Sequence, residues 1–331
     1  MAGAQERVLR RRISSVKTTK KITRAMELIA ASRVMRAQQR ARASKPYAAQ
    51  ITSVIEDLAA SGANIDHPLL RQATDVRRVA FIILSSDRGL AGAYNSSVLR
   101  AAEREVEAVR AEGADYDLVL IGRKAEGYFR FRSYRIEKAY QGISDKPSYD
   151  DAREIGEYIA ERFISGAVDR VVLVYTEFVS LGVQRPVVRN FLPLQTVETI
   201  ATGGQAENVA GYDFEPSPEA VLEALLPRYI EARLYSALLE SAAAEHASRQ
   251  RAMKSATDNA EELIIRYGRQ LNRARQDSIT TEIMEIVGGA EGLKEDKGSG
   301  EDLLIDHPFG THLFPQHLDK ADHPRTPPLS V

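Results

Sequence analysis

The segment Arg228–Val287 constrains the fold of this chain more than any other. It contains sixty consecutive residues without a proline and with a single interior glycine, Gly268. As one α-helix it would be about 90 Å long, because each helical residue adds about 1.5 Å along the axis. Helices of ordinary globular domains run roughly 8–20 residues. A helix of this length therefore needs a partner outside an ordinary core.

Heptad spacing in two segments indicates what that partner is. In the long segment, apolar and small residues recur every 3.5 residues on average: Ile230, Leu234, Ala237, Ser241, Ala244, Ser248. Residues 4–60 show the same alternation of four- and three-residue steps: Ala30, Val34, Ala37, Ala41, Ser44, Ala48, Ile51, Ile55, Leu58. The pattern continues less regularly upstream: Ile13, Val16, Lys20, Thr23. We predict that the two ends of the chain pair as a long antiparallel coiled coil, whose small seam residues allow close approach.

The middle of the chain alternates between strand-like and helix-like segments. Five segments are typical of strands: 78–86, 117–121, 134–140, 170–178 and 184–194. Helices are expected between them, chiefly over 95–112 and 150–164. This alternation favours a Rossmann-like α/β domain with about five mostly parallel strands. The predicted fold class is therefore α/β, with the α/β domain attached to the coiled coil.

Four regions follow from these patterns. Residues 1–60 and 218–289 form a discontinuous coiled-coil shaft, and residues 75–200 form the α/β domain. Residues 201–217 are expected to be a connecting loop. Residues 290–331 lose all periodicity and contain four of the six histidines, so we predict a disordered tail.

Composition excludes several kinds of function. The chain has no cysteine, which excludes disulfides and thiol catalysis. It has no apolar run near the roughly 20 residues that a membrane span requires. The net charge is −1, yet residues 7–45 hold thirteen Lys or Arg and one acid, Glu27. This basic helix could bind nucleic acid, an anionic membrane or acidic protein surfaces; it lacks the interleaved aromatics of single-strand binding.

Two further motifs could bind ligands. The turn Asp87–Gly92 lies between a strand and a helix, where a glycine turn can hold a phosphate. It matches neither dinucleotide nor P-loop spacing, so we interpret it as a tight turn and expect no cofactor. The spacing of the tail histidines does not match compact metal sites, so we expect no metal: His307, His312, His317, His323.

Five stretches, in order, resemble one protein family. They are residues 17–38 (KTTKKITRAMELIAASRVMRAQ), 85–95 (SSDRGLAGAYN), 121–129 (IGRKAEGYF), and the C-terminal pair 252–264 and 272–290. The chain from residue 1 to about 290 resembles the gamma subunit of bacterial F-type ATP synthases. The resemblance implies a rotor that couples proton flow to ATP synthesis or hydrolysis without catalysing either itself. It also implies a peripheral position on the cytoplasmic face of the plasma membrane.

The resemblance implies partners and contact residues as well. The partners are the alpha and beta subunits, the epsilon subunit and the ring of c subunits; nucleic acid is not among them, and the membrane is reached only through the complex. Contacts with the beta subunits or the surrounding ring are expected at Lys20, Lys21, Arg24, Met26, Arg249, Arg275, Gln276 and Thr280. Contacts with the c-ring or epsilon side are expected at Tyr212, Phe214 and Glu215.

Two other functional classes stay open at this point. The first is a basic coiled-coil adaptor that binds nucleic acid, with an α/β head. The second is an enzyme that binds a nucleotide at the Asp87–Gly92 turn. The extension after residue 290 has no counterpart in the family and is expected to be either an inert tail or a regulatory element.

Overall fold

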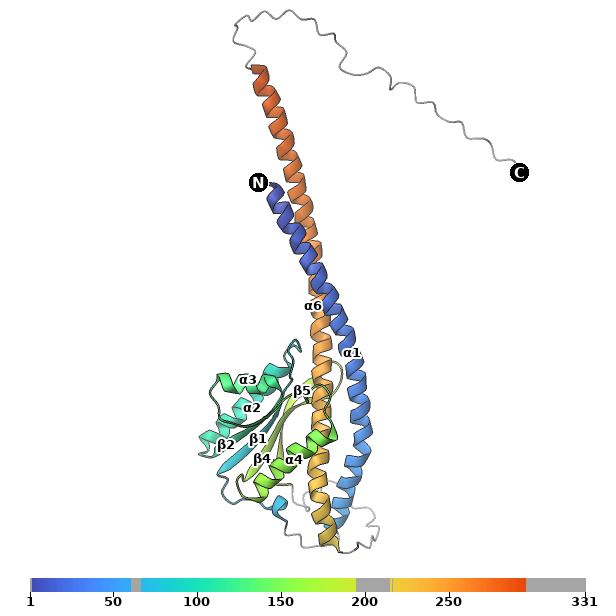
Figure 1. Ribbon diagram of the computed structural model, residues 1–331, viewed down its shortest axis with the longest axis vertical. Helices are drawn as coiled ribbons and strands as arrows, with labels where there is room; N and C mark the ends of the chain where they lie inside the picture. Colours follow the sequence, from blue (N-terminus) through green and yellow to red (C-terminus); the bar gives the residue numbers. More distant parts are fainter. Residues whose placement is uncertain (1, 61–66, 195–214, 216, 296–331) are drawn as a thin grey trace, which may run out of the picture.

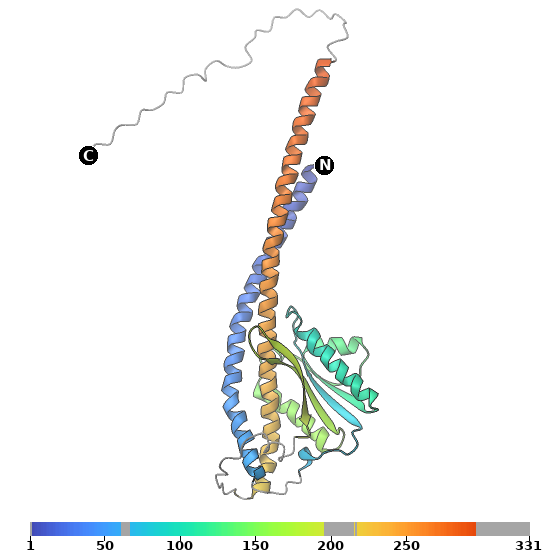
Figure 2. The same cartoon turned by 180° about the vertical axis from the view of Figure 1, so that it is seen from behind.

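Two very long helices dominate the computed structural model, which describes residues 2–60, 67–194, 215 and 217–295 (Figure 1). Helix α1 spans Ala2–Ala60 and helix α6 spans Pro218–Glu295. They run antiparallel, and the α/β domain lies beside the lower part of α6 in both views (Figures 1 and 2). The predicted pairing of the two ends of the chain is therefore present. The two helices are called the shaft below, and the α/β domain is called the head.

Burial along α1 follows the predicted seam. Positions with reduced exposure run from Leu9 to Ile55 in alternating steps of four and three, and they include Thr23 and Glu27 as well as the apolar positions. All six seam positions predicted on α6 between Ile230 and Ser248 are buried. The seam thus continues upstream into the polar part of α1, where a hydroxyl pair replaces apolar contact.

The head contains one five-stranded sheet in the order β3-β2-β1-β4-β5. The strands are β1 Arg78–Leu84, β2 Asp115–Ile121, β3 Ile136–Tyr140, β4 Arg170–Phe178 and β5 Gln184–Leu192. The first four are parallel, and β5 pairs antiparallel with β4. The expected mostly parallel sheet is confirmed.

Helices cover both faces of this sheet. Helices α2 (Tyr94–Ala111) and α3 (Arg123–Phe131) cover one face. The other face carries α4 (Tyr149–Ile164) and α6, with a short 3-10 helix at Pro68–Leu70 beside them. Alternate residues of β1 point to the two cores, so Phe81 packs with α2 and Ile82 packs toward α6. Because burial on both faces requires apolar residues throughout, β1 is a continuous apolar run.

Helix α6 is the central element of the molecule, because it packs against both α1 and the head. Residues 241–249 are all buried, which is typical of a helix surrounded on every side. Ala and Ser predominate there, so the neighbouring elements can approach closely.

Some expected boundaries differ from the structure. Helix α6 continues to Glu295, so the first six residues of the expected tail, 290–295, are helical despite Gly292. The tail from residue 296 onward, including its four histidines, lies outside the described residues. Most of the predicted loop 201–217 lies outside them too.

Candidate functional site

The upper shaft is held in register by polar pairs across the seam. The Thr257 hydroxyl lies 2.8 Å from that of Thr23, and Lys20 pairs with Glu261 at 3.0 Å. In this register the start of α1 lies beside residue 278 or so of α6. Figure 1 shows α6 extending beyond the start of α1 as a single helix. By the register given above, this part comprises residues 279–295 and is about 25 Å long.

This free tip exposes large apolar side chains. They are at least 46% exposed: Ile279, Ile283, Met284, Ile286, Val287, Leu293. An isolated helix with such a surface is stable in water only when something covers that surface. The tip is therefore suited to a surrounding apolar sleeve.

The basic residues predicted on α1 lie in different surroundings. Lys20 is half-buried and is used within the shaft by its pair with Glu261. Lys21 is exposed, and Met26 is partly exposed. Arg24 is exposed and donates to both carboxylate oxygens of Glu27, at 2.9 and 3.0 Å. Lys21, Arg24 and Met26 are therefore accessible to a partner, whereas Lys20 sets the register of the shaft.

The predicted residues near the tip of α6 are all exposed. Arg275 and Gln276 lie beside the start of α1, and Thr280 lies at the base of the free tip. The Thr280 hydroxyl donates to the carbonyl of Gln276 at 2.9 Å, which leaves the side chain close to its own helix. The structure thus brings these three residues together on one stretch of α6, roughly 30 residues above Arg249.

Arg249 does not have the exposed position that a contact with the surrounding ring requires. It is 8% exposed and pairs with Glu245 at 2.8 Å, while its guanidinium donates to the carbonyls of Arg88 and Gly89 at 3.3–3.4 Å. Within this chain Arg249 is used by the head, and its contact with the surrounding ring stays a prediction. Its side chain fastens the Asp87–Gly92 turn of the head to the shaft.

The residues predicted to contact the c-ring side are described only in part. Tyr212 and Phe214 lie outside the described residues. Glu215 is exposed, just before α6 begins. Its contact role stays a prediction.

In doubly wound sheets, ligands bind in the crevice at the carboxyl ends of the strands where the strand order reverses. Here that point lies between β1 and β4, and it is filled by protein. Ala91 and Tyr94 after β1, and Phe178 at the end of β4, pack with Ala244 of α6. The Tyr94 hydroxyl lies 2.7 Å from that of Ser241. In this head, the crevice at which doubly wound sheets commonly bind ligands is occupied by side chains that contact the shaft. This occupation counts against nucleotide binding at the Asp87–Gly92 turn.

The turn itself is tied to two neighbouring loops. The Asp87 carboxylate accepts from the backbone amides of Arg123, Gly142 and Ser144 at 3.0–3.3 Å. These amides follow β2 and β3, so one side chain joins three strand ends. This positions the carbonyls of Arg88 and Gly89 that Arg249 reaches.

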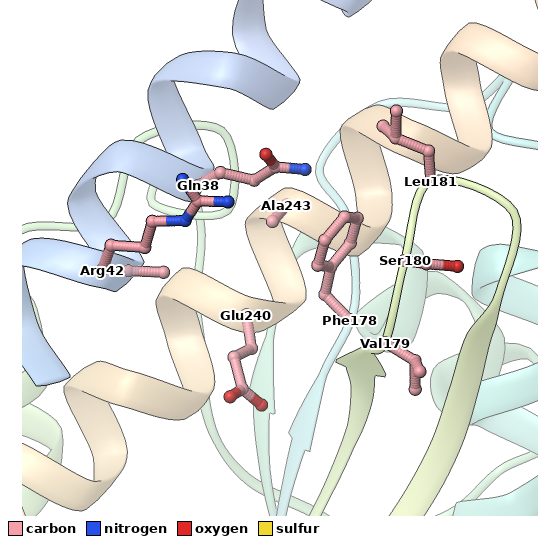
Figure 3. A pocket seen from close by; sticks show the side chains of 9 residues that line it. Gln38, Arg42, Phe178, Val179, Ser180, Leu181, Glu240 and Ala243 are labelled. Atoms are coloured by element: carbon pink, nitrogen blue, oxygen red, sulfur yellow. The ribbon is translucent and has the colours of Figure 1, made fainter.

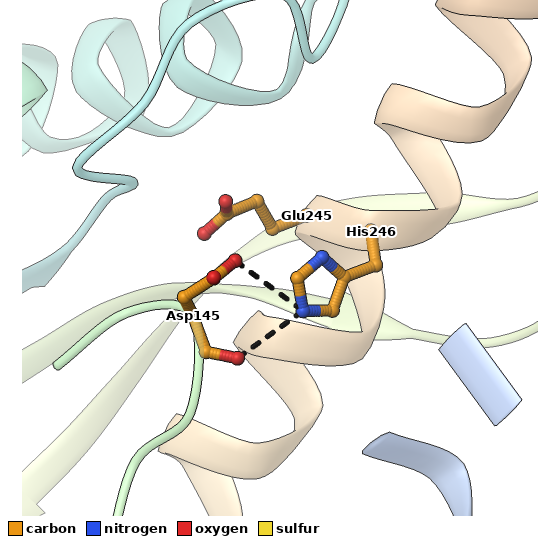
Figure 4. A group of neighbouring side chains, drawn as sticks. All are labelled: Asp145, Glu245 and His246. Carbon is orange, nitrogen blue, oxygen red and sulfur yellow. Dashed lines mark hydrogen bonds and ion pairs between the residues drawn. The ribbon is translucent and has the colours of Figure 1, made fainter. Parts of the chain in front are cut away.

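A second contact between the head and the shaft lies one helical turn below Arg249. Figure 4 shows Glu245 and His246 of α6 beside Asp145, from the loop after β3. His246 Nε2 lies 3.2 Å from the Asp145 carbonyl, and because a carbonyl only accepts, Nε2 carries the proton. Arg33 of α1 donates to the Asp145 carboxylate, so this loop joins both shaft helices to the head.

Charge within this junction is balanced by the chain's own side chains. The ligand atoms of Asp145, Glu245 and His246 lie within 4.8 Å of one another, as in a metal site. However, Arg33 pairs with Asp145 and Arg249 pairs with Glu245. A divalent cation would add two uncompensated charges to a buried site, so we interpret the group as a structural ion-pair network.

Burial shifts the pKa of two members of this network, Glu245 and His246. It raises the pKa of Glu245, which the charge of Arg249 partly opposes. It lowers the pKa of His246, while the Asp145 carbonyl and carboxylate act in the opposite direction. His246 is therefore held in its neutral form at the junction.

The β4–β5 hairpin is a third attachment point. Phe178, Val179 and Leu181 form one side of a groove of about 340 Å³, with Gln38 and Arg42 of α1 on the other and α6 between (Figure 3). Ser248 of α6 donates to the Gln184 side chain at 3.2 Å. The head thus contacts the shaft at strand ends, loop and hairpin.

Sequence reasoning did not identify Asp145, Glu245 or His246 as important. A signal was present for the last two: charged or imidazole side chains interrupt a run of Ala and Ser at positions 242–248. A large polar side chain within a helix segment that otherwise consists of Ala and Ser indicates a buried polar contact.

Together these features define a class of protein: a two-helix shaft with a rigidly attached α/β head and a free apolar tip. Among the described residues, none of the helices combines the length and apolarity that a membrane span requires. The chemistry of the described residues is that of attachment and contact.

Comparisons with known proteins agree with this class. A family described as ATP synthase matches residues 5–293. The chain is 54% identical over 299 residues to the ATP synthase gamma chain of Frankia casuarinae, covering 88% of this chain and 99% of the relative. It is 52% identical over 297 residues to that of Kineococcus radiotolerans, with 88% and 98% covered.

Two solved structures share the fold. A chain of the Euglena gracilis mitochondrial ATP synthase (OSCP/F1/c-ring) matches with a TM-score of 0.62 at 16% identity, covering 92% of this chain and all of that one. A chain of the Tetrahymena thermophila central stalk and c-ring matches with a TM-score of 0.52 at 24% identity, covering 71% and 99%. The chain belongs to the ATP synthase gamma-chain family. The matches give no support to the nucleic-acid adaptor.

Proposed function

We propose that this chain is the rotor of a bacterial F-type ATP synthase and has no catalytic site of its own. It transmits torque between a proton-driven ring of c subunits and a catalytic ring of alpha and beta subunits. The epsilon subunit binds near the head, and the complex lies on the cytoplasmic face of the plasma membrane. The family membership supports this assignment of partners and place.

One observation carries the proposal: α6 is a single helix of 78 residues that runs from the head to the free tip. It is about 115 Å long. Pairing with α1 stiffens it, and three attachments prevent the head from turning independently of it. A force applied to the head is therefore delivered at the tip.

Contact with the alpha and beta subunits is proposed for the accessible residues only. Lys21, Arg24 and Met26 form one candidate surface, and Arg275, Gln276 and Thr280 form the other. Coupling requires that each catalytic site bind one angular position of the shaft better than the others. An uneven distribution of charge around the shaft provides such a difference.

The division into parts is proposed in the same terms. Residues 1–60 and 218–289 act as the shaft, 75–200 as the head, and 201–217 as the connection that faces the c-ring side. The segment 290–331 extends beyond the family match, which ends at residue 293. Truncation after Gly292, with ATP hydrolysis and proton pumping measured, distinguishes an inert extension from a regulatory one.

A single-molecule rotation assay tests the central proposal. Because the chain has no cysteine, Arg104→Cys on the exposed face of α2 gives one attachment point for a bead. With the alpha and beta subunits fixed to a surface, ATP should drive stepwise rotation of the bead in one direction. ATP hydrolysis by the complex with a stationary bead would contradict the rotor assignment.

The contact surfaces have their own test. Lys21→Gln/Arg24→Gln should weaken coupling by a factor of roughly 2–30, because it removes two exposed ion-pairing charges that contribute about 0.2–1 kcal/mol each. The control Arg104→Gln/Arg110→Gln removes the same charge from α2 of the head and should leave coupling unchanged. Equal effects of the two pairs would mean that only net charge matters.

A further inference from the structure

A small cavity lies where α1, the loop after β3 and α6 meet. Its volume is about 190 Å³, and five of its ten lining residues are basic or imidazole side chains. Those five and one carboxylate are here called the basic niche: Arg33, Arg36, Arg40, Asp145, Lys146, His246. The cavity is thus shared by both shaft helices and the head.

The charge of the basic niche is not balanced by the chain. Arg33 is paired with Asp145. Arg36, Arg40 and Lys146 have no hydrogen-bond or ion-pair partner among the described residues. Three unpaired cations therefore border one concave surface, and their mutual repulsion is relieved when an anion enters.

His246 forms the buried part of the niche. It is 2% exposed, and its Nδ1 has no hydrogen-bond partner in the part of the chain that the structure describes. Nε2–H donates to the Asp145 carbonyl, which fixes the tautomer and leaves a lone pair on Nδ1. An anion in the niche would therefore act on this buried ring through its charge, which favours the protonated imidazole.

We propose that the basic niche binds a phosphate-class oxyanion. Arginine suits this ligand because its planar guanidinium donates two parallel hydrogen bonds to phosphate oxygens. The volume fits a phosphate group with a few waters and is below the roughly 300–1,000 Å³ of pockets that enclose larger ligands. The bound species is therefore inorganic phosphate, or the terminal phosphate of a nucleotide whose remaining part lies outside.

A bound oxyanion would add a contact between three elements that already meet at Asp145, through its ion pair with Arg33 and its hydrogen bond from His246. Arg36 and Arg40 lie on α1, Lys146 lies on the head loop and His246 lies on α6. Binding would hold the head more firmly to the shaft when phosphate is abundant. This role is separate from the rotor function, and its test needs no other subunit.

The test measures phosphate binding to the full chain by calorimetry. Inorganic phosphate is titrated against chloride at constant ionic strength, with ADP and ATP in parallel and without magnesium. Phosphate should bind with a dissociation constant in the millimolar range or below, and Arg36→Gln/Arg40→Gln should weaken it at least tenfold. The control Arg11→Gln/Arg12→Gln removes the same charge from exposed positions of α1 outside the cavity and should bind as the unchanged chain does.

Two further readouts locate the ligand. Phosphate should raise the pKa of His246, measured by NMR of labelled histidine, because a nearby anion favours the imidazolium. It should also slow hydrogen exchange of residues 143–147. If Arg36→Gln/Arg40→Gln fails to fold, Lys146→Gln on the exposed loop is expected to weaken binding in the same direction.

Several results would overturn the proposal. Equal binding by the niche and control variants would mean an adventitious ion only. Binding of ADP or ATP that Arg36→Gln/Arg40→Gln does not weaken would assign the nucleotide to another site. Binding of a glutamate-rich peptide that phosphate does not displace would assign the niche to an acidic protein segment.

Discussion

The buried pair of Arg249 and Glu245 gives the sharpest test of how the head is attached. Arg249 is 8% and Glu245 is 1% exposed, and their charged atoms lie 2.8 Å apart. Arg249→Gln would leave Glu245 as a buried carboxylate without its counter-charge. Breaking one partner of a buried pair costs about 3–5 kcal/mol in the free energy of unfolding. The lost hydrogen bonds to the Arg88 and Gly89 carbonyls are long and add little.

The second substitution makes the measurement specific. Glu245→Gln removes the carboxylate that needs compensation, so Arg249→Gln/Glu245→Gln should be more stable than the sum of the single changes predicts. The expected coupling energy is about 1–3 kcal/mol. Urea unfolding of the full chain, followed by circular dichroism, measures each free energy. Lys254→Gln, an exposed position one turn further along α6, is the matched control.

The pH dependence of Arg249→Gln has a definite sign. Burial raises the pKa of Glu245, and removing Arg249 takes away the charge that opposes this. Above pH 4.5 the folded variant then holds a proton that the unfolded chain has released, so its stability falls as pH rises. A cost below about 1 kcal/mol, together with additive single changes, would refute the buried-pair interpretation.

Three other changes are predicted. The unchanged chain should lose stability between pH 7 and 5, because burial lowers the pKa of His246 and only the unfolded chain takes up the proton readily near pH 6.5. His246→Gln should lessen this loss. Urea unfolding of both chains across this pH range measures it, and an equal dependence of the unfolding free energy on pH in the two chains would contradict the prediction. Gly122→Ala should lower the free energy of unfolding by about 3 kcal/mol or more, because φ is +92° and the new Cβ would lie 2.4 Å from the Ser85 carbonyl oxygen. Gly127→Ala, whose new methyl group would have no atom within 4 Å, is the control. Similar thermal stability of the two variants would disprove the clash. Gly268→Ala should stabilise the shaft by about 0.5–1 kcal/mol, since nothing lies within 4 Å of its Cβ position; an unchanged or lower melting temperature would count against it.

The sequence by itself determined the shaft and the fold class. Heptad spacing is a local property, because each seam residue is set by neighbours three and four positions away along one helix. The same holds for β1, whose unbroken apolar run indicates a strand covered on both faces. The pairing of the chain ends, and the sheet between them, could be predicted on these grounds.

Long-range side-chain contacts could not be predicted in this way. Arg249 reaches the Gly89 carbonyl across 160 residues of sequence, and His246 reaches Asp145 across 101. No periodicity distinguishes a charged helix residue that faces a partner subunit from one that faces its own head. Arg249 was accordingly expected at an outer surface, and Lys20 was expected to face a partner when it pairs with Glu261.

Only the tertiary structure decided which face of α6 each element covers. Two neighbours, α1 and the head, bury residues 241–249 on all sides. Further along the helix, among the described residues only α1 packs against α6, and residues 279–295 extend beyond α1 as well. Burial on all sides turns Glu245, Arg249 and His246 from surface charges into a buried network, in which the pKa of Glu245 is raised and that of His246 is lowered. The physical reason is that solvation depends on everything that surrounds a side chain, and the neighbours in sequence supply only one part of it.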